Sequence, residues 1–342
     1  MKKIIFSLCL ILFLLTAKPV VAEDFNGLGQ NNKFGIHISS ENDLNDAATL
    51  VNSNGGSWGY VTLVIREDER DVERWNRAFI KMSEKKLIPI IRLATNQDAT
   101  GWRKPREEDA LAWVEFLEKL PWPTQKKHIL IFNEPNHKNE WGGEINPEEY
   151  AHVYRSFWEE FKKSDPDFMV LPGALDLAAP NSKSTMDALD FWHKMYEEDD
   201  LIFTLFDGWN SHSYPNPGFC GSPKATGRIS IQGYLWEIES LKKFYLNPNL
   251  PIFITETGWG CSLLSEKNIS DNYKYAFDEV WSDPQVAAVT PFILNYPNRP
   301  FISFSFKNQN GQFFDSYEAI KNLPKTKGEP ALTQKIKKKI RN

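Results

Sequence analysis

From residue 34 onward the sequence repeats one alternation eight times: a short apolar run, then a stretch with helical periodicity. The apolar runs cover residues 34–38, 60–66, 87–93, 128–134, 168–175, 205–213, 252–256 and 286–295. The helical stretches cover residues 41–52, 71–85, 107–120, 147–163, 185–197, 229–244, 271–281 and 316–322. The runs are apolar throughout rather than at every second residue, which is typical of parallel strands buried on both faces.

Eight strand-and-helix units in a chain of 342 residues predict a single-domain (β/α)8 TIM barrel of the α/β class. A doubly wound open sheet is the alternative, but such a sheet usually carries a glycine-rich phosphate turn after its first strand. Here that position reads Ser39-Ser40-Glu41, and the sequence contains neither a G-x-G-x-x-G motif nor a P-loop. Because no linker or low-complexity segment interrupts the pattern, we interpret residues 23–330 as one domain.

The two ends of the chain depart from this pattern. Residues 1–22 combine a basic start, a short apolar run and small residues before Glu23, which indicates a secretory signal peptide. The apolar run is shorter than the ~20 residues that a membrane span needs, and an uncleaved anchor is the alternative. We therefore expect an exported chain, either secreted or held in the periplasm or at the cell surface. Residues 331–342 form a basic tail, which we expect to be solvated.

A carboxylate ends the fourth apolar run, in the stretch HILIFNEPNHKNEWGG that begins at His128. Placing Glu134 at the mouth of a hydrophobic strand is costly in desolvation, and Pro135 blocks further strand pairing. The seventh run, PIFITETGW, ends in the same way at Glu256. Two glutamates at the carboxyl ends of barrel strands would converge over one mouth, the arrangement that double-displacement glycoside hydrolysis uses.

These motifs resemble those of the clan A glycoside hydrolases. In that clan the acid/base glutamate ends the fourth strand directly after an asparagine and often before a proline, as in Asn133-Glu134-Pro135. The nucleophilic glutamate ends the seventh strand, where this chain has Glu256. The Thr-Glu-Thr-Gly-Trp sequence around this residue is also similar to that of plant-type β-1,3-glucanases.

The cellulase and mannanase branch of the clan adds two further matches and two departures. Its H-x-Y motif at the sixth strand matches His212-Ser213-Tyr214, and its arginine at the end of the second strand matches Arg66. That branch has a histidine near the end of the third strand, where this chain has Arg92. It also has a tryptophan at the end of the eighth strand, where this chain reads FILNY, residues 292–296, without a tryptophan. The departures leave the family and the substrate open.

The resemblance implies an exported, retaining O-glycosyl hydrolase with a carbohydrate substrate. It implies that Glu134 is the proton donor and Glu256 the nucleophile, which Arg66 and the Tyr214 hydroxyl hold in its ionised form. Asn133 is expected to bind the sugar hydroxyl beside the reacting carbon. We expect a monomer acting on a β-linked oligo- or polysaccharide, with no cofactor and no metal.

Further candidates for substrate binding carry open alternatives. His212 is expected to position a carboxylate or a sugar hydroxyl, unless it is a core histidine. Rings at Trp259, Trp141 and Tyr296 lie on expected loops at the same end, where they would stack on sugars or simply pack. Arg66 has acidic neighbours at positions 67 and 68 as alternative partners. Asp176 and Arg92 also end strands, and the sequence does not separate ligand contact from packing for either.

Cys220 and Cys261 follow the sixth and seventh runs, so their loops should emerge side by side. An exported chain would join them in a disulfide, whereas a cytosolic one would keep two free thiols. Two cysteines without a cluster of histidines do not make a zinc site.

The net charge of the chain limits the kinds of partner that it can bind. A formal net charge of −5 without a basic, aromatic-rich patch excludes a nucleic-acid or anionic-membrane surface as the main partner. A carbohydrate-binding barrel without catalysis is the alternative function. Because both glutamates, Asn133 and the H-x-Y motif are intact, the enzyme is favoured.

Overall fold

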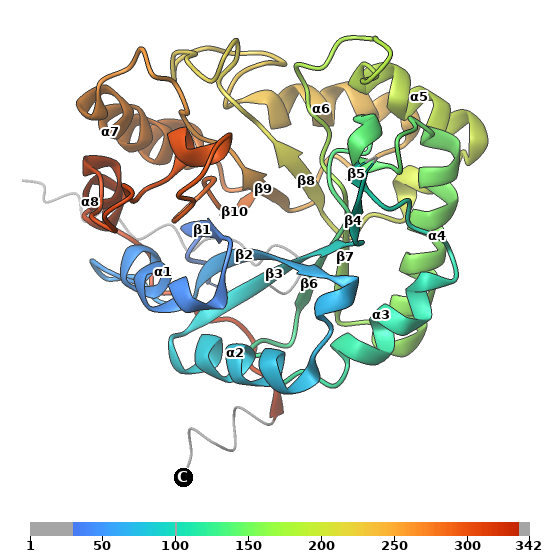
Figure 1. Cartoon of the computed structure of the whole chain (residues 1–342), viewed down its shortest axis with the longest axis horizontal. Coiled ribbons are helices and arrows are strands. Elements are labelled where there is room, and N and C mark those ends of the chain that lie inside the picture. The colour runs from blue at the N-terminus through green and yellow to red at the C-terminus, as the bar shows by residue number, and fades with distance from the viewer. Residues whose placement is uncertain (1–29, 100, 335–342) are drawn as a thin grey trace, which may run out of the picture.

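The computed structural model describes residues 30–99 and 101–334 of the chain (Figure 1). The longer strands are β1 (Gly35–Ile38), β2 (Gly59–Arg66), β3 (Leu87–Ala94), β6 (Lys127–Ile131), β7 (Phe168–Pro172), β8 (Trp209–His212), β9 (Ile252–Glu256) and β10 (Val286–Val289). The α-helices are α1 (Leu44–Val51), α2 (Val72–Glu84), α3 (Asp109–Leu117), α4 (Pro147–Ser164), α5 (Ala188–Glu198), α6 (Gly233–Leu241), α7 (Glu266–Tyr275) and α8 (Asp315–Lys321). The predicted alternation is therefore present.

The strands form two parallel sheets around a common centre, and the helices surround them (Figure 1). One sheet has the order β1-β2-β3-β6-β7 and the other the order β10-β9-β8. At one junction Phe34, next to β1, pairs with Val289 of β10, and at the other Asp176, which follows β7, pairs with His212 of β8, each as a single parallel bridge. The protein is thus an α/β protein with parallel sheets, as the sequence predicts, and the strand ends that carry the site meet at one end.

Both faces of the strands are buried. Along β2, Tyr60 belongs to a cluster between the strands, whereas Val61 and Leu63 belong to the larger cluster between strands and helices. This two-sided burial explains why the strand sequences lack polar alternation.

Side-chain caps fix the start of several helices. Asp71 accepts hydrogen bonds from two amides at the start of α2, and Asn146 caps α4 ahead of its proline at the first position. Ser265 caps α7 at the amide of Asn268, so this helix begins five residues before the predicted position 271. Residues Ala276–Val280 then continue it as a π-helical turn.

The strands differ from the predicted runs mainly at their carboxyl ends. The fourth run was expected to extend to Glu134, but β6 ends at Ile131 because Phe132 (φ 66°) and Glu134 (φ 27°) adopt left-handed backbone conformations. The fifth and eighth runs are likewise shorter at their carboxyl ends, since β7 ends at Pro172 and β10 at Val289. The sixth run is shorter mainly at its amino end, because β8 begins at Trp209. A small hairpin, β4 (Gln97–Asp98) with β5 (Gly101–Trp102), has no counterpart in the prediction.

The start of the predicted tail lies against the amino ends of the strands. The amide of Gln125 donates to the carbonyl of Ala331, and the Thr333 hydroxyl donates to the carbonyl of Trp122. Leu332 packs on the cluster between the strands. Residues 1–22, the predicted signal peptide, and the basic residues 335–342 lie outside the described residues. Within the described ranges no helix combines the length and apolar character needed to cross a membrane.

Candidate active site

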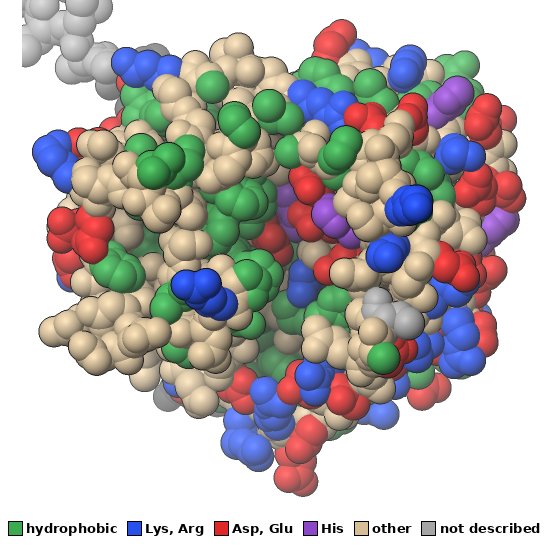
Figure 2. Space-filling view, turned by 45° about the horizontal axis from the view of Figure 1, so that its top comes forward, with side chains coloured by type: hydrophobic (Ala, Val, Ile, Leu, Met, Phe, Trp, Pro, Cys, Tyr) green, Lys and Arg blue, Asp and Glu red, His purple; other side chains and the backbone are tan. Residues whose placement is uncertain are grey.

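One face of the molecule is hollowed at its centre (Figure 2). Hydrophobic side chains flank one side of the hollow, and acidic, basic and histidine side chains line the other. The hollow therefore offers an apolar surface on one side and charged or polar groups on the other.

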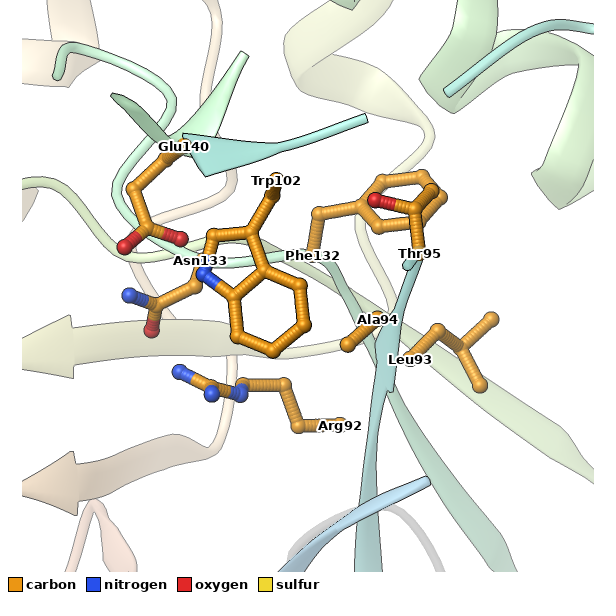
Figure 3. A pocket seen from close by; sticks show the side chains of 8 residues that line it. All are labelled: Arg92, Leu93, Ala94, Thr95, Trp102, Phe132, Asn133 and Glu140. Carbon is orange, nitrogen blue, oxygen red and sulfur yellow. The ribbon is translucent and has the colours of Figure 1, made fainter. Parts of the chain in front are cut away.

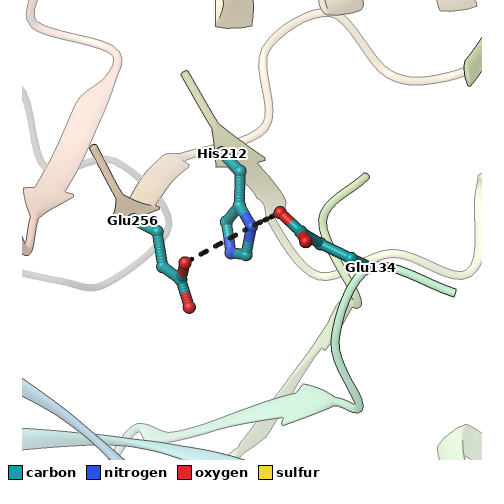
Figure 4. A group of neighbouring side chains, drawn as sticks. All are labelled: Glu134, His212 and Glu256. Atoms are coloured by element: carbon teal, nitrogen blue, oxygen red, sulfur yellow. Dashed lines mark hydrogen bonds and ion pairs between the residues drawn. The ribbon is translucent and has the colours of Figure 1, made fainter. Parts of the chain in front are cut away.

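Three side chains from different strand ends meet at the site (Figure 4). The Nδ1 atom of His212 lies 2.8 Å from a carboxylate oxygen of Glu134 and 3.8 Å from one of Glu256. One oxygen of each glutamate and a ring nitrogen of the histidine all lie within 4.8 Å of one another. The structure therefore brings together both glutamates and the histidine of H-x-Y.

Glu256 has a largely buried carboxylate with several partners. Its side chain is 11% exposed, and it accepts a hydrogen bond of 3.0 Å from the Tyr214 hydroxyl. Nη1 of Arg92 lies 3.7 Å away and Nδ1 of His37 lies 3.9 Å away. Burial raises the pKa of Glu256, but His212, His37, Arg92 and Tyr214 outweigh it and lower the pKa below its ordinary value. Such a carboxyl stays ionised.

Glu134 is more open, with a side chain that is 22% exposed. Its backbone carbonyl accepts a hydrogen bond from the amide of His137, which helps to hold the turn after β6. Its neighbour His212 is buried, and burial lowers the pKa of this histidine. The carboxylates of Glu256 and Glu134 outweigh that effect and raise the pKa. Once protonated, His212 donates to Glu134 at short range.

The structure moves the role predicted for Arg66 to Arg92. Arg66 is more than a third exposed and pairs with Asp68 at 3.0 Å and with Glu69 at 3.7 Å. The reason is register: Arg92 of β3 pairs with Val64 of β2, so Arg66 lies two residues further toward the carboxyl end. Arg92 is the arginine that lies near the carboxylate of Glu256, at 3.7 Å, so the predicted pairing of Arg66 with Glu256 is wrong.

Two of the three predicted stacking rings are packing residues. Trp141 is fully buried, packs edge-on against Tyr150, and donates from Nε1 to Glu149 at 3.0 Å. Trp259 is 2% exposed and donates from Nε1 to the carbonyl of Gly221 at 2.8 Å. Neither ring offers a face to a sugar, so both predictions are wrong, because the expected loops fold back onto the core. Tyr296 is half-buried and packs edge-on against Phe301.

A narrow pocket beside the glutamates contains a third carboxyl group (Figure 3). Arg92, Trp102, Asn133 and Glu140 contribute polar or aromatic groups to its lining. Burial raises the pKa of Glu140 to about 7; the nearby Arg92 opposes this shift, as does a hydrogen bond from Asn133. The side-chain oxygen of Asn133 is buried and accepts no hydrogen bond from the described residues. Asn133 therefore has a free acceptor beside the reacting centre.

Sequence reasoning missed His37 and Glu140, and it left Arg92 undecided. His37 is buried on β1, where burial lowers its pKa to about 4, so it is neutral beside Glu256 at neutral pH. Its position in an apolar run gave no signal of its own. Glu140 follows Glu134 by six residues within the same loop, which was a weak signal because loop carboxylates are usually solvated.

Among the described residues, the spacing of their possible ligand atoms makes Glu134, His212 and Glu256 a candidate metal site. Glu134, His212 and Glu256 each present one ligand atom within 4.8 Å of the others. However, Nδ1 of the histidine is bonded to Glu134, and the guanidinium of Arg92 lies 3.7 Å from Glu256. A fixed positive charge at that distance repels a cation, so the set is better suited to an ion-pair network.

The loops after β8 and β9 are joined covalently. Cys220 and Cys261 form a disulfide, with their Cα atoms 5.1 Å apart. This spacing lies within the range that disulfide geometry requires. The bond ties the loop that follows Tyr214 to the loop that follows Glu256.

A family model and several solved structures match the chain. Residues 100–322 match the model described as glycosyl hydrolase catalytic core. No curated protein matches the chain.

Three solved structures illustrate the fold. A monomeric β-xylosidase from Caulobacter crescentus is 16% identical with a TM-score of 0.60, over 84% of this chain and 67% of that one. A GH128 (subgroup II) endo-β-1,3-glucanase from Sorangium cellulosum is 15% identical with a TM-score of 0.57, over 85% and 98% of the two chains. A GH53 catalytic domain from Ignisphaera aggregans is 14% identical with a TM-score of 0.57, over 90% and 99%. At these identities the likeness concerns the fold.

Proposed function

The chain belongs to the glycosyl hydrolase catalytic core family, and from this premise we propose that it hydrolyses O-glycosidic bonds with retention of configuration. Its structural neighbours come from families of glycoside hydrolase clan A. In this proposal Glu256 is the nucleophile and Glu134 the acid/base. The substrate is a β-linked oligo- or polysaccharide, a class suggested by the β-xylosidase and β-glucanase among the neighbours.

The separation of the glutamates carries the proposal. Retaining enzymes hold their two carboxyl groups about 5–5.5 Å apart, whereas inverting enzymes leave about 6.5–9.5 Å for a water molecule. Oxygens of Glu134 and Glu256 lie within 4.8 Å of each other. That distance suits direct attack by one carboxylate while the other serves the leaving oxygen.

The first step needs an ionised nucleophile and an available proton. Glu256 attacks the anomeric carbon, and Glu134 gives its proton to the glycosidic oxygen, so that the leaving group departs as an alcohol. The Tyr214 hydroxyl and Arg92 orient the attacking carboxylate. In this proposal Asn133 binds a sugar hydroxyl next to the reacting carbon, and its buried side-chain oxygen, which lacks a partner among the described residues, supports this role.

The second step reverses the role of the acid. Glu134, now ionised, takes a proton from water, which attacks the glycosyl-enzyme and frees Glu256. His212, whose Nδ1 lies 2.8 Å from Glu134, is the proposed hydrogen-bond partner of this carboxyl group in both of its protonation states.

We extend the proposal to architecture and location. The two single bridges at Phe34 and Asp176, together with the fold of the neighbours, support a closed (β/α)8 barrel. The Cys220–Cys261 disulfide supports export to an oxidising compartment. A monomer is the proposed state.

Substitution of the two glutamates tests the division of roles. Glu256→Ala should abolish cleavage of every substrate, because no glycosyl-enzyme can form. Glu134→Ala should still react with an activated aryl glycoside and accumulate the intermediate, since the good leaving group needs no proton. Added azide should then restore turnover and give a β-azide of retained configuration.

Glu144→Ala is the matched control, because Glu144 is an exposed carboxylate on the same loop as Glu134. It should behave like the wild type. Equal losses for Glu134→Ala and Glu256→Ala on the aryl glycoside, or an inverted azide from the Glu134 variant, would overturn the assignment. Carbohydrate binding without any cleavage by the wild type would favour the non-catalytic alternative.

A further inference from the structure

A histidine–aspartate pair lies beside the acid/base and has no role in the proposed mechanism. Nε2 of His137 is 3.0 Å from Oδ2 of Asp176, and each side chain is about a third exposed, 31% and 30%. His137 follows Glu134 by three residues on the loop after β6, and Asp176 follows β7. A partly exposed pair at this end of the strands is accessible to a substrate.

The pair is built into the backbone of both loops. The buried side chain of Asn136 donates to the carbonyls of Asp176 and Met186, each at 3.0 Å, and accepts from the amide of Asp176 at 3.1 Å. The amide of His137 donates to the carbonyl of Glu134 at 2.8 Å. The position of the imidazole is thus fixed relative to the acid/base.

The charges of Asp176 and Glu134 influence the protonation of the His137 ring and so the kind of hydrogen bond that it can make with a substrate. Burial raises the pKa of Asp176, but hydrogen bonds from His137 and from the amide of Ala178 outweigh it and lower the pKa. An ionised Asp176 accepts from Nε2–H, and this hydrogen bond, together with the charge of Glu134, raises the pKa of His137. The Nδ1 atom, which no hydrogen bond occupies among the described residues, is left free: it accepts in the neutral ring and donates once the ring is protonated.

The proposed roles of the two glutamates indicate which part of the substrate lies beside His137 and Asp176. The nucleophile Glu256 on β9 bonds to the sugar that stays, while Glu134 after β6 protonates the oxygen of the group that leaves. The leaving group therefore lies on the side of Glu134, over the loops after β6 and β7. His137 and Asp176 stand on these two loops.

We propose that His137, held by Asp176, binds the leaving saccharide through a hydrogen bond between Nδ1 and one of its hydroxyl groups. This inference rests on the proposed function and deepens it, because it names a hydroxyl-rich sugar rather than an apolar group as the natural leaving group. The site is a specificity determinant: it adds binding energy for a sugar leaving group and none for a nitrophenyl ring.

Two kinds of substrate distinguish binding of the leaving saccharide from a general loss of activity. The wild type is assayed with 4-nitrophenyl β-glucoside, β-xyloside and β-mannoside, and with the matching β-linked oligosaccharide. In His137→Ala, kcat/KM for the oligosaccharide should fall about tenfold, the loss expected when one hydrogen bond to the substrate is removed. The value for the aryl glycoside should change by less than about threefold. Asp176→Asn, which keeps the shape but weakens the hold on the ring, should show the same pattern in smaller degree.

Transfer to a sugar acceptor gives an independent measure. Cellobiose, xylobiose or mannobiose, added to the glycosyl-enzyme formed from the matching aryl glycoside, occupies the leaving-group site and competes with water. In His137→Ala the ratio of transfer to hydrolysis should fall, while the rate of hydrolysis without acceptor is unchanged.

His152→Ala is the matched control, since His152 pairs with Glu198 at 2.7 Å on the outer helices. Equal losses of His137→Ala on both substrate types, or an unchanged transfer ratio, would overturn the inference while leaving the proposed function intact. No cleavage of any glycoside by the wild type would overturn both. A melting temperature equal to that of the wild type shows that each variant is folded.

Discussion

Glu256 and Glu134 sit within 4.8 Å of each other in opposite surroundings. Glu256 is 11% exposed and lies within 4 Å of polar atoms of His37, Arg92, His212 and Tyr214. Glu134 is 22% exposed, and His212 is its ion-pair partner among the described residues. The carboxylate of Glu256, the proposed nucleophile, is held as an ion by groups on several strands, whereas that of Glu134, the proposed acid/base, keeps access to solvent.

This difference reflects what each group must do. A nucleophile keeps one protonation state, so fixed charges around it cost no reorganisation during the reaction. An acid/base changes its protonation state twice per cycle, which calls for an exchangeable partner and a route for protons. His212 lies between the two and is the shared element.

Among the groups that surround the two glutamates, the largest effect on kcat/KM is expected from removing the fixed charge of Arg92 beside Glu256. Arg92→Met should lower kcat/KM by about 10²–10³-fold, the size of effect seen when one preorganised electrostatic group is lost. Arg66→Met is the matched control, because Arg66 pairs with exposed acids instead; it should change kcat/KM by less than about twofold. Steady-state kinetics on one aryl glycoside measures both. A larger loss in the Arg66 variant would reverse the assignment.

A smaller effect with a pH signature is expected from Tyr214→Phe. Activity needs ionised Glu256, so it falls as the pH drops through the lowered pKa of this group. Loss of the Tyr214 hydrogen bond removes one cause of that lowering, so the acid limb of the pH–kcat/KM profile should move to higher pH. The rate at the optimum should fall about tenfold. An acid limb that does not move would show that Glu256 is not the group titrating there.

The disulfide should affect stability more than chemistry. Cys220 and Cys261 are 41 residues apart in sequence, and loss of such a cross-link costs about 2–4 kcal/mol. A Cys220→Ser, Cys261→Ser variant should therefore melt at a lower temperature. The bond joins loops on the Glu256 side of the site. At temperatures below the new melting temperature, azide should therefore restore the activity of a Glu134→Ala variant equally well with and without the disulfide. A loss of rescue there would place the disulfide in control of the acid side as well.

No effect is expected from metal removal. Dialysis against a chelator should leave kcat/KM within about twofold of the untreated protein, because Arg92 repels a cation from the Glu256 side of the three-residue cluster. Inactivation by the chelator, reversed by zinc or manganese, would instead make Glu134, His212 and Glu256 ligands.

The sequence anticipated the positions that a strand motif defines. Strand β9 has the predicted bounds, and Glu134, His212 and Glu256 come together as their order along the chain implied. It failed where the answer depends on register or on burial of a loop. The choice between Arg66 and Arg92 depends on how β2 and β3 are offset, and no pattern within either strand encodes that offset.

Loop residues were the least predictable. The indole of Trp141 is in a loop by sequence, yet it is fully buried because its Nε1 finds Glu149 on α4. His137 and Asp176 are 39 residues apart, and their pairing depends on the buried amide of Asn136 that joins the two loops. Such contacts between distant segments leave no periodic trace.

The short segment at residues 330–333 covers the amino ends of the strands. Pro330 and Ala331 line a small pocket with Tyr60, Ile88 and His128, at the end opposite the glutamates. Burial lowers the pKa of His128 to about 3, so the ring stays uncharged there. A truncation before Pro330 would remove this cover and expose the pocket lining and the His128 ring to water, which should lower the free energy of unfolding. An affinity tag or fused partner is therefore better attached beyond residue 334.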